Sequence, residues 1–251
     1  MTQLLSGQCQ MKNKLIQLLN DNSRSKKDFR IENMDGDEAT VYIYDAIGDW
    51  YGIAAEDFVR DFNAITASTI HIRINSPGGD VFEARAIQTA IRQHKSHTIA
   101  HIDGLAASAA TGIAEAANEV EISPGSFFMI HNSWTLAIGN SIELRDTAEM
   151  LDKVDASILA DYEKKTGKSA DEIKEWMNAE TWFDATEAVE HGFCDRLADD
   201  ANESTENRWN LSAYSNTPKA LKEKPKAKQP SEPKFDRELN ERRMEMLNII
   251  G

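Results

Sequence analysis

A serine, a histidine and a pair of glycines stand about one strand and one helix apart in this 251-residue sequence. Ser108 lies in the run of small residues 104–112, where a strand is expected to give way to a helix. A nucleophile on so sharp a turn needs small neighbours, as in the G-x-S-x-G motif of hydrolases, and Ala106 and Ala110 flank this serine. Amides at the start of the helix would favour a developing negative charge beside its hydroxyl. The pattern therefore indicates a nucleophile, with an N-cap or a small core residue as the structural alternative.

Two further positions could complete such a site. Gly78 and Gly79 follow a strand, and paired glycines allow a backbone N–H to turn outward at positive φ, where it can hold an oxyanion. His131 ends a short apolar strand and could act as a general base. Taken singly, the glycines fit an ordinary turn and the histidine fits a structural role. Together with Ser108 they supply the nucleophile, the base and the oxyanion donors that acyl transfer needs.

These residues can meet only if the fold brings the ends of several segments to one place. Apolar residues at alternate positions predict strands over residues 41–47, 69–75, 97–103, 119–122 and 127–131. Helical spacing predicts helices over residues 54–65, 81–94, 106–118, 141–165, 169–178 and 186–192. Strands that alternate with helices predict an α/β fold with right-handed crossovers and a parallel sheet. The carboxyl ends of parallel strands share one edge, so we expect the site at that edge.

The composition is that of a globular protein, with 41% hydrophobic and 28% charged residues. No uninterrupted apolar run of about 18 residues occurs, which excludes a transmembrane helix and disfavours a membrane partner. Residues 1–20 lack the apolar stretch and the cleavage site of a secretory signal, so we expect a cytoplasmic protein. The two cysteines, Cys9 and Cys194, are expected to be reduced thiols.

Charge and proline divide the chain unevenly. The net charge is −14, yet residues 201–251 carry ten Lys and Arg against eight Asp and Glu, so the acidic excess lies in residues 1–200. An acidic body repels phosphate, which disfavours nucleic acid as a partner. The tail also holds four of the six prolines. We therefore expect an N-terminal arm (1–33), a main domain (34–200), a mobile linker rich in Pro and Lys (201–234) and a short C-terminal helix (235–251).

The sequence contains no motif that is specific for a metal or a nucleotide. His94, His97 and His101 are close in sequence, but they straddle a helix end and a strand whose side chains alternate between faces. Neither C-x-x-C, H-E-x-x-H nor G-x-x-x-x-G-K-[ST] occurs. We therefore expect no metal, no cofactor and no ATP hydrolysis by this chain.

Three segments of the chain resemble the serine protease family ClpP: residues 74–81, 104–111 and 129–132. Their amino-acid sequences are most similar to those of the ClpP-like head maturation proteases of phages and prophages. Residues 164–167, 180–183 and 187–192 carry further parts of the resemblance. The motifs occur in the family's order at compatible intervals, and the resemblance covers residues 40–197. It implies a ClpP/crotonase-like βαβ spiral with a helical C-terminal part and flexible terminal extensions.

The resemblance also implies a serine endopeptidase and assigns its residues. Ser108 matches the nucleophile and His131 the general base, while the backbone N–H groups of Gly79 and Ala109 match the oxyanion donors. Glu180 stands where housekeeping members carry the aspartate that orients the histidine. The other candidates for this acid are Asp184, Asp155 and Asp152.

An assembly and a substrate follow from the same resemblance. ClpP relatives stack rings around an enclosed chamber, so we expect a homo-oligomeric ring or stacked rings, with helix 141–165 as the contact between rings. The implied substrates are scaffold or capsid-protein extensions, cut in the host cytoplasm or inside the procapsid, with capsid, portal or scaffold proteins as partners. The alternatives are the proteolytic subunit of a general ATP-dependent Clp protease, a crotonase-type acyl-CoA enzyme and an inactive assembly subunit.

Overall fold

The computed structural model describes residues 29–33, 36–49, 51–199 and 209–222, and within this part of the chain all strands belong to one sheet. The strands are β1 (Phe29–Glu32), β2 (Glu38–Ile43), β3 (Thr69–Ser76), β4 (His97–Ala107), β5 (Glu119–Ile122), β6 (Phe127–Ile130), β7 (Thr181–Asp184) and β8 (Arg196–Leu197). The helices are α2 (Ala55–Phe62), α3 (Val81–Gln93), α4 (Ala109–Glu115), α5 (Ser141–Thr166), α6 (Ala170–Asn178), α7 (Ala185–Glu190) and α8 (Lys219–Lys222).

The sheet is mainly parallel. Its strand order is β1-β2-β3-β4-β5-β8, and β6 joins it by pairing with both β4 and β7. The edge pairs β1–β2 and β6–β7 are antiparallel, whereas the pairs from β2 to β8 and the β4–β6 pair are parallel. The α/β fold that the sequence predicts is therefore confirmed.

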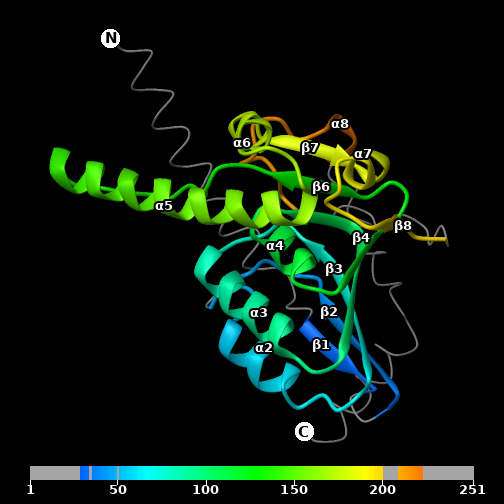
Figure 1. The fold of residues 1–251 in the computed structure, drawn as a ribbon. Helices are drawn as coiled ribbons and strands as arrows, with labels where there is room; N and C mark the ends of the chain where they lie inside the picture. Colours follow the sequence, from blue (N-terminus) through cyan, green and yellow to red (C-terminus); the bar gives the residue numbers. More distant parts are fainter. Residues whose placement is uncertain (1–28, 34–35, 50, 200–208, 223–251) are drawn as a thin grey trace, which may run out of the picture.

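Helices α2, α3 and α4 lie on the same side of the sheet (Figure 1), and the alternation of apolar residues decides which face they cover. In β3, Ile70, Ile72 and Ile74 are fully buried, whereas the side chains between them remain partly exposed. Phe58 and Phe62 of α2 stack with ring centroids 5.0 Å apart in the same buried cluster. Burial of each such side chain contributes about 1.5–3 kcal/mol, so this layer stabilises the face of the sheet that the helices cover.

Strand β4 is longer than the sequence pattern predicts, and its extra length determines where Ser108 lies. The pattern predicts a helix over residues 106–118, but β4 continues to Ala107 and α4 begins only at Ala109. The extension exists because Leu105–Ala107 pair with Phe127–Met129 of β6, a tertiary contact that overrides the helical preference of alanine. Ser108 is therefore the single residue between β4 and α4.

Both ends of the described chain differ from the expected boundaries. Residues 29–32, assigned to an N-terminal arm, form edge strand β1 against β2. Residues 209–222, assigned to a linker, fold back onto the body, where Trp209 and Leu211 are buried beside Met129. The short helix expected over residues 235–251 lies outside the described residues. The folded unit therefore extends beyond residues 34–200 on both sides.

Helix α5 projects from the body (Figure 1), and its sequence explains why. An Asn140–Glu143 capping box begins the helix and Gly167, in the left-handed conformation, ends it, so its length is set locally. Of its side chains only Tyr162 is buried. None of the helices in the described part of the chain combines the length and the apolar composition needed to cross a bilayer.

A close backbone approach at Gly79 generates a test of this fold. Gly79 has φ 151°, and a Cβ there would overlap the carbonyl group of Ile47. We expect Gly79→Ala to lower the free energy of unfolding by about 1–3 kcal/mol in urea denaturation, because both the conformation and the contact become unfavourable. Gly36→Ala is the matched control, since a Cβ there meets only ordinary contacts at 3.5 Å or more. Equal stability of the two variants would contradict the observed approach of residues 47 and 79.

Candidate active site

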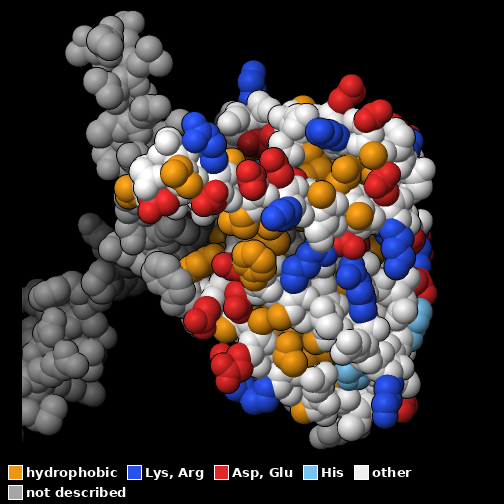
Figure 2. Space-filling view, turned by 60° about the vertical axis from the view of Figure 1, so that its left-hand side comes forward, with side chains coloured by type: hydrophobic (Ala, Val, Ile, Leu, Met, Phe, Trp, Pro, Cys, Tyr) orange, Lys and Arg blue, Asp and Glu red, His pale blue; other side chains and the backbone are white. Residues whose placement is uncertain are grey.

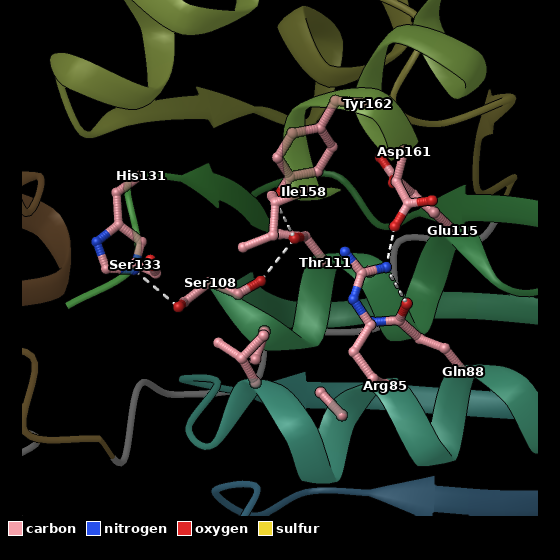
Figure 3. A pocket seen from close by; sticks show the side chains of 14 residues that line it. Arg85, Gln88, Ser108, Thr111, Glu115, His131, Ser133, Ile158, Asp161 and Tyr162 are labelled. Carbon is pink, nitrogen blue, oxygen red and sulfur yellow. Dashed lines mark hydrogen bonds and ion pairs between the residues drawn. The ribbon is translucent and has the colours of Figure 1, made fainter. Parts of the chain in front are cut away.

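The structure brings Ser108 and His131 together. The Nε2 atom of His131 lies 2.7 Å from the Oγ atom of Ser108 (Figure 3). Ser108 directly follows β4 and His131 directly follows β6, and because these strands are parallel neighbours their carboxyl ends share one edge. The N–H of Ser108 also donates to the carbonyl of Met129 at 2.9 Å, which continues the strand pairing up to the serine itself.

Ser108 has an unusual backbone conformation. Its φ is 55° and its ψ is −127°, values that non-glycine residues seldom adopt. Such a conformation costs on the order of 1–3 kcal/mol and persists only where the surroundings enforce it. Here the strand pairing before Ser108 and helix α4 after it enforce the turn. The result is a serine that starts a helix without capping it and directs its hydroxyl towards His131.

The glycine pair lies against this turn. A Cβ on Gly78 would come within 2.8 Å of the Cβ of Ser108, so only glycine allows the two backbones to lie this close. The bridge between Gly79 and Ile47 uses the N–H groups of Ile47 and Asp80, which leaves the N–H of Gly79 outside it. Ala109 is the first residue of α4, so its N–H has no partner within the helix. Both amides can therefore serve as oxyanion donors.

His131 is held neutral. Burial lowers the pKa of its imidazole to about 4, and the negative charges of Glu180 and Asp155 raise that pKa only in part. A neutral imidazole at pH 7 can accept the Ser108 proton, which is the first requirement of a general base.

The Glu180 carboxylate, the expected orienting acid, binds other groups. It accepts hydrogen bonds from the backbone N–H of Ser215 at 2.9 Å, from that of Asn216 at 2.7 Å and from Trp182 Nε1 at 3.3 Å. Within residues 29–33, 36–49, 51–199 and 209–222, no hydrogen bond joins a carboxylate to His131. Glu180 as the orienting acid stays a prediction, and its influence on the imidazole is electrostatic in this structure.

The alternative acids have different surroundings. Asp155 Oδ1 accepts from the backbone N–H of Ser133 at 2.7 Å, so it anchors the turn that follows His131. Asp184 caps helix α7 by accepting from Glu187 N at 2.9 Å. Asp152 is exposed on α5. Of these three, only Asp155 contributes to the electrostatics of His131.

Tyr214 lies beside His131, although the local sequence pattern does not indicate it. Its hydroxyl donates to the carbonyl of Pro77 at 2.7 Å, and its ring centroid lies 5.4 Å from that of His131 in an edge-to-face arrangement. Proline and charge made residues 201–234 resemble a linker. The available signal was the spacing of Trp209, Leu211 and Tyr214, which places apolar side chains in that otherwise polar stretch.

A pocket opens beside Ser108 and His131 between α3, α4 and α5. It holds about 460 Å³ of space, including its open mouth. Val81, Ala84 and Ile158 give it apolar walls, while its far end is polar (Figure 3). At that end Arg85 pairs with Asp161, and burial raises the pKa of Glu115 to about 8. The pocket can receive a substrate side chain next to the serine.

Metal ligands are not assembled in the part of the chain that the structure describes. No group of three or more His, Cys, Asp or Glu residues there has the geometry to hold a metal ion. His101 contacts His71 at 2.9 Å and Glu121 at 2.8 Å, and it does not join His94 and His97 in a cluster. Cys194 is a buried free thiol, and Cys9 lies outside the described residues.

Comparisons with known proteins point to one family of proteases. The sequence profile of the family described as Clp protease matches residues 38–201, which is more than half of the chain. The ATP-dependent Clp protease proteolytic subunit 1 of Protochlamydia amoebophila is 28% identical over 69% of this chain and 86% of its own length. Proteolytic subunit 2 of Treponema pallidum is 30% identical over 58% of this chain and 74% of its own length.

A solved structure of a relative has a similar fold. A point mutant of ClpP1 from Listeria monocytogenes has a TM-score of 0.57 at 24% identity, over 70% of this chain and 94% of its own. The spiral α/β architecture expected from the sequence is thereby confirmed. On the profile match, the fold and the relatives together, the chain belongs to the Clp protease family and is a serine peptidase.

Proposed function

We propose that this chain cleaves peptide bonds with Ser108 as the nucleophile and His131 as the general base. The observation that carries the proposal is the 2.7 Å contact between Ser108 Oγ and Nε2 of the partly buried His131 imidazole. A crotonase-type acyl-CoA enzyme would not need this pair, and an inactive subunit would not need to keep it at hydrogen-bond distance.

The proposed chemistry follows the order of proton transfers in serine peptidases. Ser108 Oγ attacks the carbonyl carbon of the scissile peptide while His131 Nε2 takes the hydroxyl proton. The negative oxygen of the tetrahedral intermediate accepts hydrogen bonds from the N–H groups of Gly79 and Ala109, each contributing about 3 kcal/mol. His131 then gives its proton to the leaving amine, and water attacks the acyl-enzyme by the reverse route. The charges of Glu180 and Asp155 stabilise the imidazolium while it exists.

For the biological role we propose a phage or prophage head maturation protease that cuts scaffold or capsid-protein extensions. The support for this role is the resemblance of three segments to the head maturation branch of the family, residues 74–81, 104–111 and 129–132. The second candidate is a proteolytic subunit that works with a Clp ATPase, which the names of the relatives favour. Co-expression with the capsid and scaffold proteins of the phage or prophage that carries this chain should give processed capsid protein in the first case. Degradation of a folded substrate only with ATP and a Clp ATPase would support the second.

We also propose a homo-oligomeric ring or stacked rings. The support is α5 and the loop before it, where Ile138 is 88% exposed and Ile142 is 65% exposed, a costly arrangement for an isolated chain. Figure 2 shows hydrophobic side chains on the face of the molecule that carries this helix.

Replacing the nucleophile is the direct test of the chemistry. We expect Ser108→Ala to lower peptidase activity at least ~10³-fold and to abolish covalent labelling by a fluorophosphonate, because no other group forms the acyl-enzyme. Peptide cleavage and labelling are measured on the same preparations. Ser68→Ala, on an exposed loop, should keep both activities. Unchanged cleavage by Ser108→Ala would refute the assignment.

The pH dependence tests the state of the base. Because burial lowers the His131 pKa to about 4, the imidazole stays neutral well below its ordinary pKa, and kcat/KM should hold until the pH approaches 4. The profile is measured alongside circular dichroism, so that acid unfolding is separated from titration. An acid limb centred near 6.5, the ordinary pKa of histidine, in a folded sample would show that the imidazole is solvated during catalysis.

The exposed apolar side chains test the assembly. We expect the double variant Ile138→Asp/Ile142→Asp to shift the protein to smaller species in analytical ultracentrifugation, because charged groups would have to be buried in the interface. Lys153→Ala, an exposed change on the same helix, is the control. An unchanged sedimentation profile for the double variant would exclude this surface as the contact.

A further inference from the structure

We propose that Tyr214 is a positioning residue of the active site, carried there by a C-terminal strap that we define as residues 209–217. The proposal rests on the proposed peptidase function and adds to it a side chain that orients His131. It also gives Glu180 a second task, since this carboxylate fastens the strap.

The strap is attached to the body by apolar packing at one end. Trp209 is 5% exposed and Leu211 is 4% exposed, and both pack on a small cluster with Leu105, Ala107 and Met129. These body residues belong to the paired ends of β4 and β6, the two strands that position Ser108 and His131. The strap therefore packs on the same strand ends that build the site.

Hydrogen bonds attach the strap at its other end. Glu180 accepts from the backbone N–H groups of Ser215 and Asn216, and the Asn216 side chain donates to Ala179 O at 2.6 Å. The backbone of Glu180 has φ 50°, which is uncommon for a residue other than glycine. Charged acceptors make stronger hydrogen bonds than neutral ones, so this carboxylate is an effective anchor.

Between these two anchors Tyr214 contacts two parts of the site. Its ring meets the imidazole of His131 edge to face, and its hydroxyl donates to Pro77 O. Pro77 directly precedes Gly78 and Gly79, so the phenol also restrains the loop that carries an oxyanion donor. The ring of Trp182 also packs against the phenol, with the two ring centroids 5.7 Å apart.

The contact with His131 supplies a restraint that the orienting acid would otherwise provide. Among the described residues no carboxylate bonds to the imidazole, so its ring is restrained by Ser108 at Nε2 and by the phenol of Tyr214 packed against it. A base displaced by about 1 Å can lose about 10²-fold in rate, so such packing has a measurable effect.

The strap lies apart from the pocket that would receive substrate. The lining of that pocket comes from α3, α4, α5 and the residues around His131, and it includes no residue of the strap. A substrate side chain can therefore enter the pocket while Tyr214 keeps its contacts. This favours a positioning role over a plug that must leave before catalysis. The strap also lies beyond residues 38–201, so the matched family profile does not include it.

Substitution of Tyr214 separates the ring from the hydroxyl. We expect Tyr214→Ala to lower kcat at least ~10-fold with KM changed less than ~3-fold, because orientation in the transition state is lost while the pocket is intact. Tyr214→Phe keeps the ring and should stay within about 3-fold of the natural protein. Tyr42→Ala, which removes a tyrosine from the sheet next to Arg30, is the control for a general effect on folding.

The pH dependence of kcat/KM distinguishes a positioning role from a loss of stability, because lower stability alone would not shift the acid limb. The groups facing His131 are Ser108, Tyr214, Glu180 and Asp155, and removal of the phenol lets water reach the imidazole. Solvation should raise the pKa of His131, so the acid limb of kcat/KM should move up by about one pH unit or more in Tyr214→Ala. Tyr214→Phe should leave the limb in place.

A double-mutant cycle tests the anchoring by Glu180. If Glu180 fastens the strap, Glu180→Ala and Tyr214→Ala share the loss of one restraint, although Glu180→Ala also removes a charge near His131. The loss of kcat in the double variant should therefore be at least about 3-fold smaller than the product of the two single losses. Effects on kcat that multiply would show that Glu180 acts independently of Tyr214 and would overturn the anchoring role.

The outcomes distinguish this proposal from the proposed function. Failure of the natural protein to react at Ser108 with a fluorophosphonate would remove the peptidase assignment itself. A natural protein that reacts, together with a Tyr214→Ala variant of equal kcat and unchanged pH profile, would overturn only the role of Tyr214. Higher activity in Tyr214→Ala would overturn it too, because the strap would then be an obstruction.

Discussion

The pairing of β4 with β6 is the interaction on which the site depends. It carries β4 past the point where its alanines would favour a helix, and it ends in the hydrogen bond from Ser108 N to Met129 O. The abrupt change to α4 then forces Ser108 to φ 55°, and the same pairing places His131 at the neighbouring strand end. A strained serine, a facing imidazole and free helix amides are thus consequences of one parallel ladder.

The proximity of Ser108, His131 and the glycine pair could be predicted from the sequence because their signals are local. Small residues around Ser108, the pair Gly78-Gly79 and the apolar strand before His131 each restrict the backbone in a recognisable way. Parallel strands bring such ends together without any long-range signal, so the alternation of strands and helices was sufficient to predict the meeting of Ser108 and His131. The same reasoning gave the wrong start for α4, because the competing β6 contact is tertiary.

Tyr214 could not be predicted in this way. Its segment is polar, and the order it has comes from contacts far away in sequence, chiefly Pro77 and Glu180. Composition measures how much apolar surface a segment can bury by itself, whereas Trp209 and Leu211 bury theirs in a surface that β4 and β6 have already formed. The resemblance assigned Glu180 as the orienting acid, while two of its three hydrogen bonds go to the strap, which lies outside the matched family profile.

Burial has opposite effects on His131, the proposed base, before and during the proposed reaction. In the resting site it lowers the pKa of His131, which makes the imidazole a weaker proton acceptor. Once the serine proton moves, the same low-dielectric surroundings strengthen the attraction between the imidazolium and the charges of Glu180 and Asp155. The two carboxylates are each held by backbone N–H groups, so neither must reorganise when the charge appears. A fixed pair of charges can therefore compensate for the direct hydrogen bond that no carboxylate of the described residues makes to His131, provided that the imidazole keeps its position.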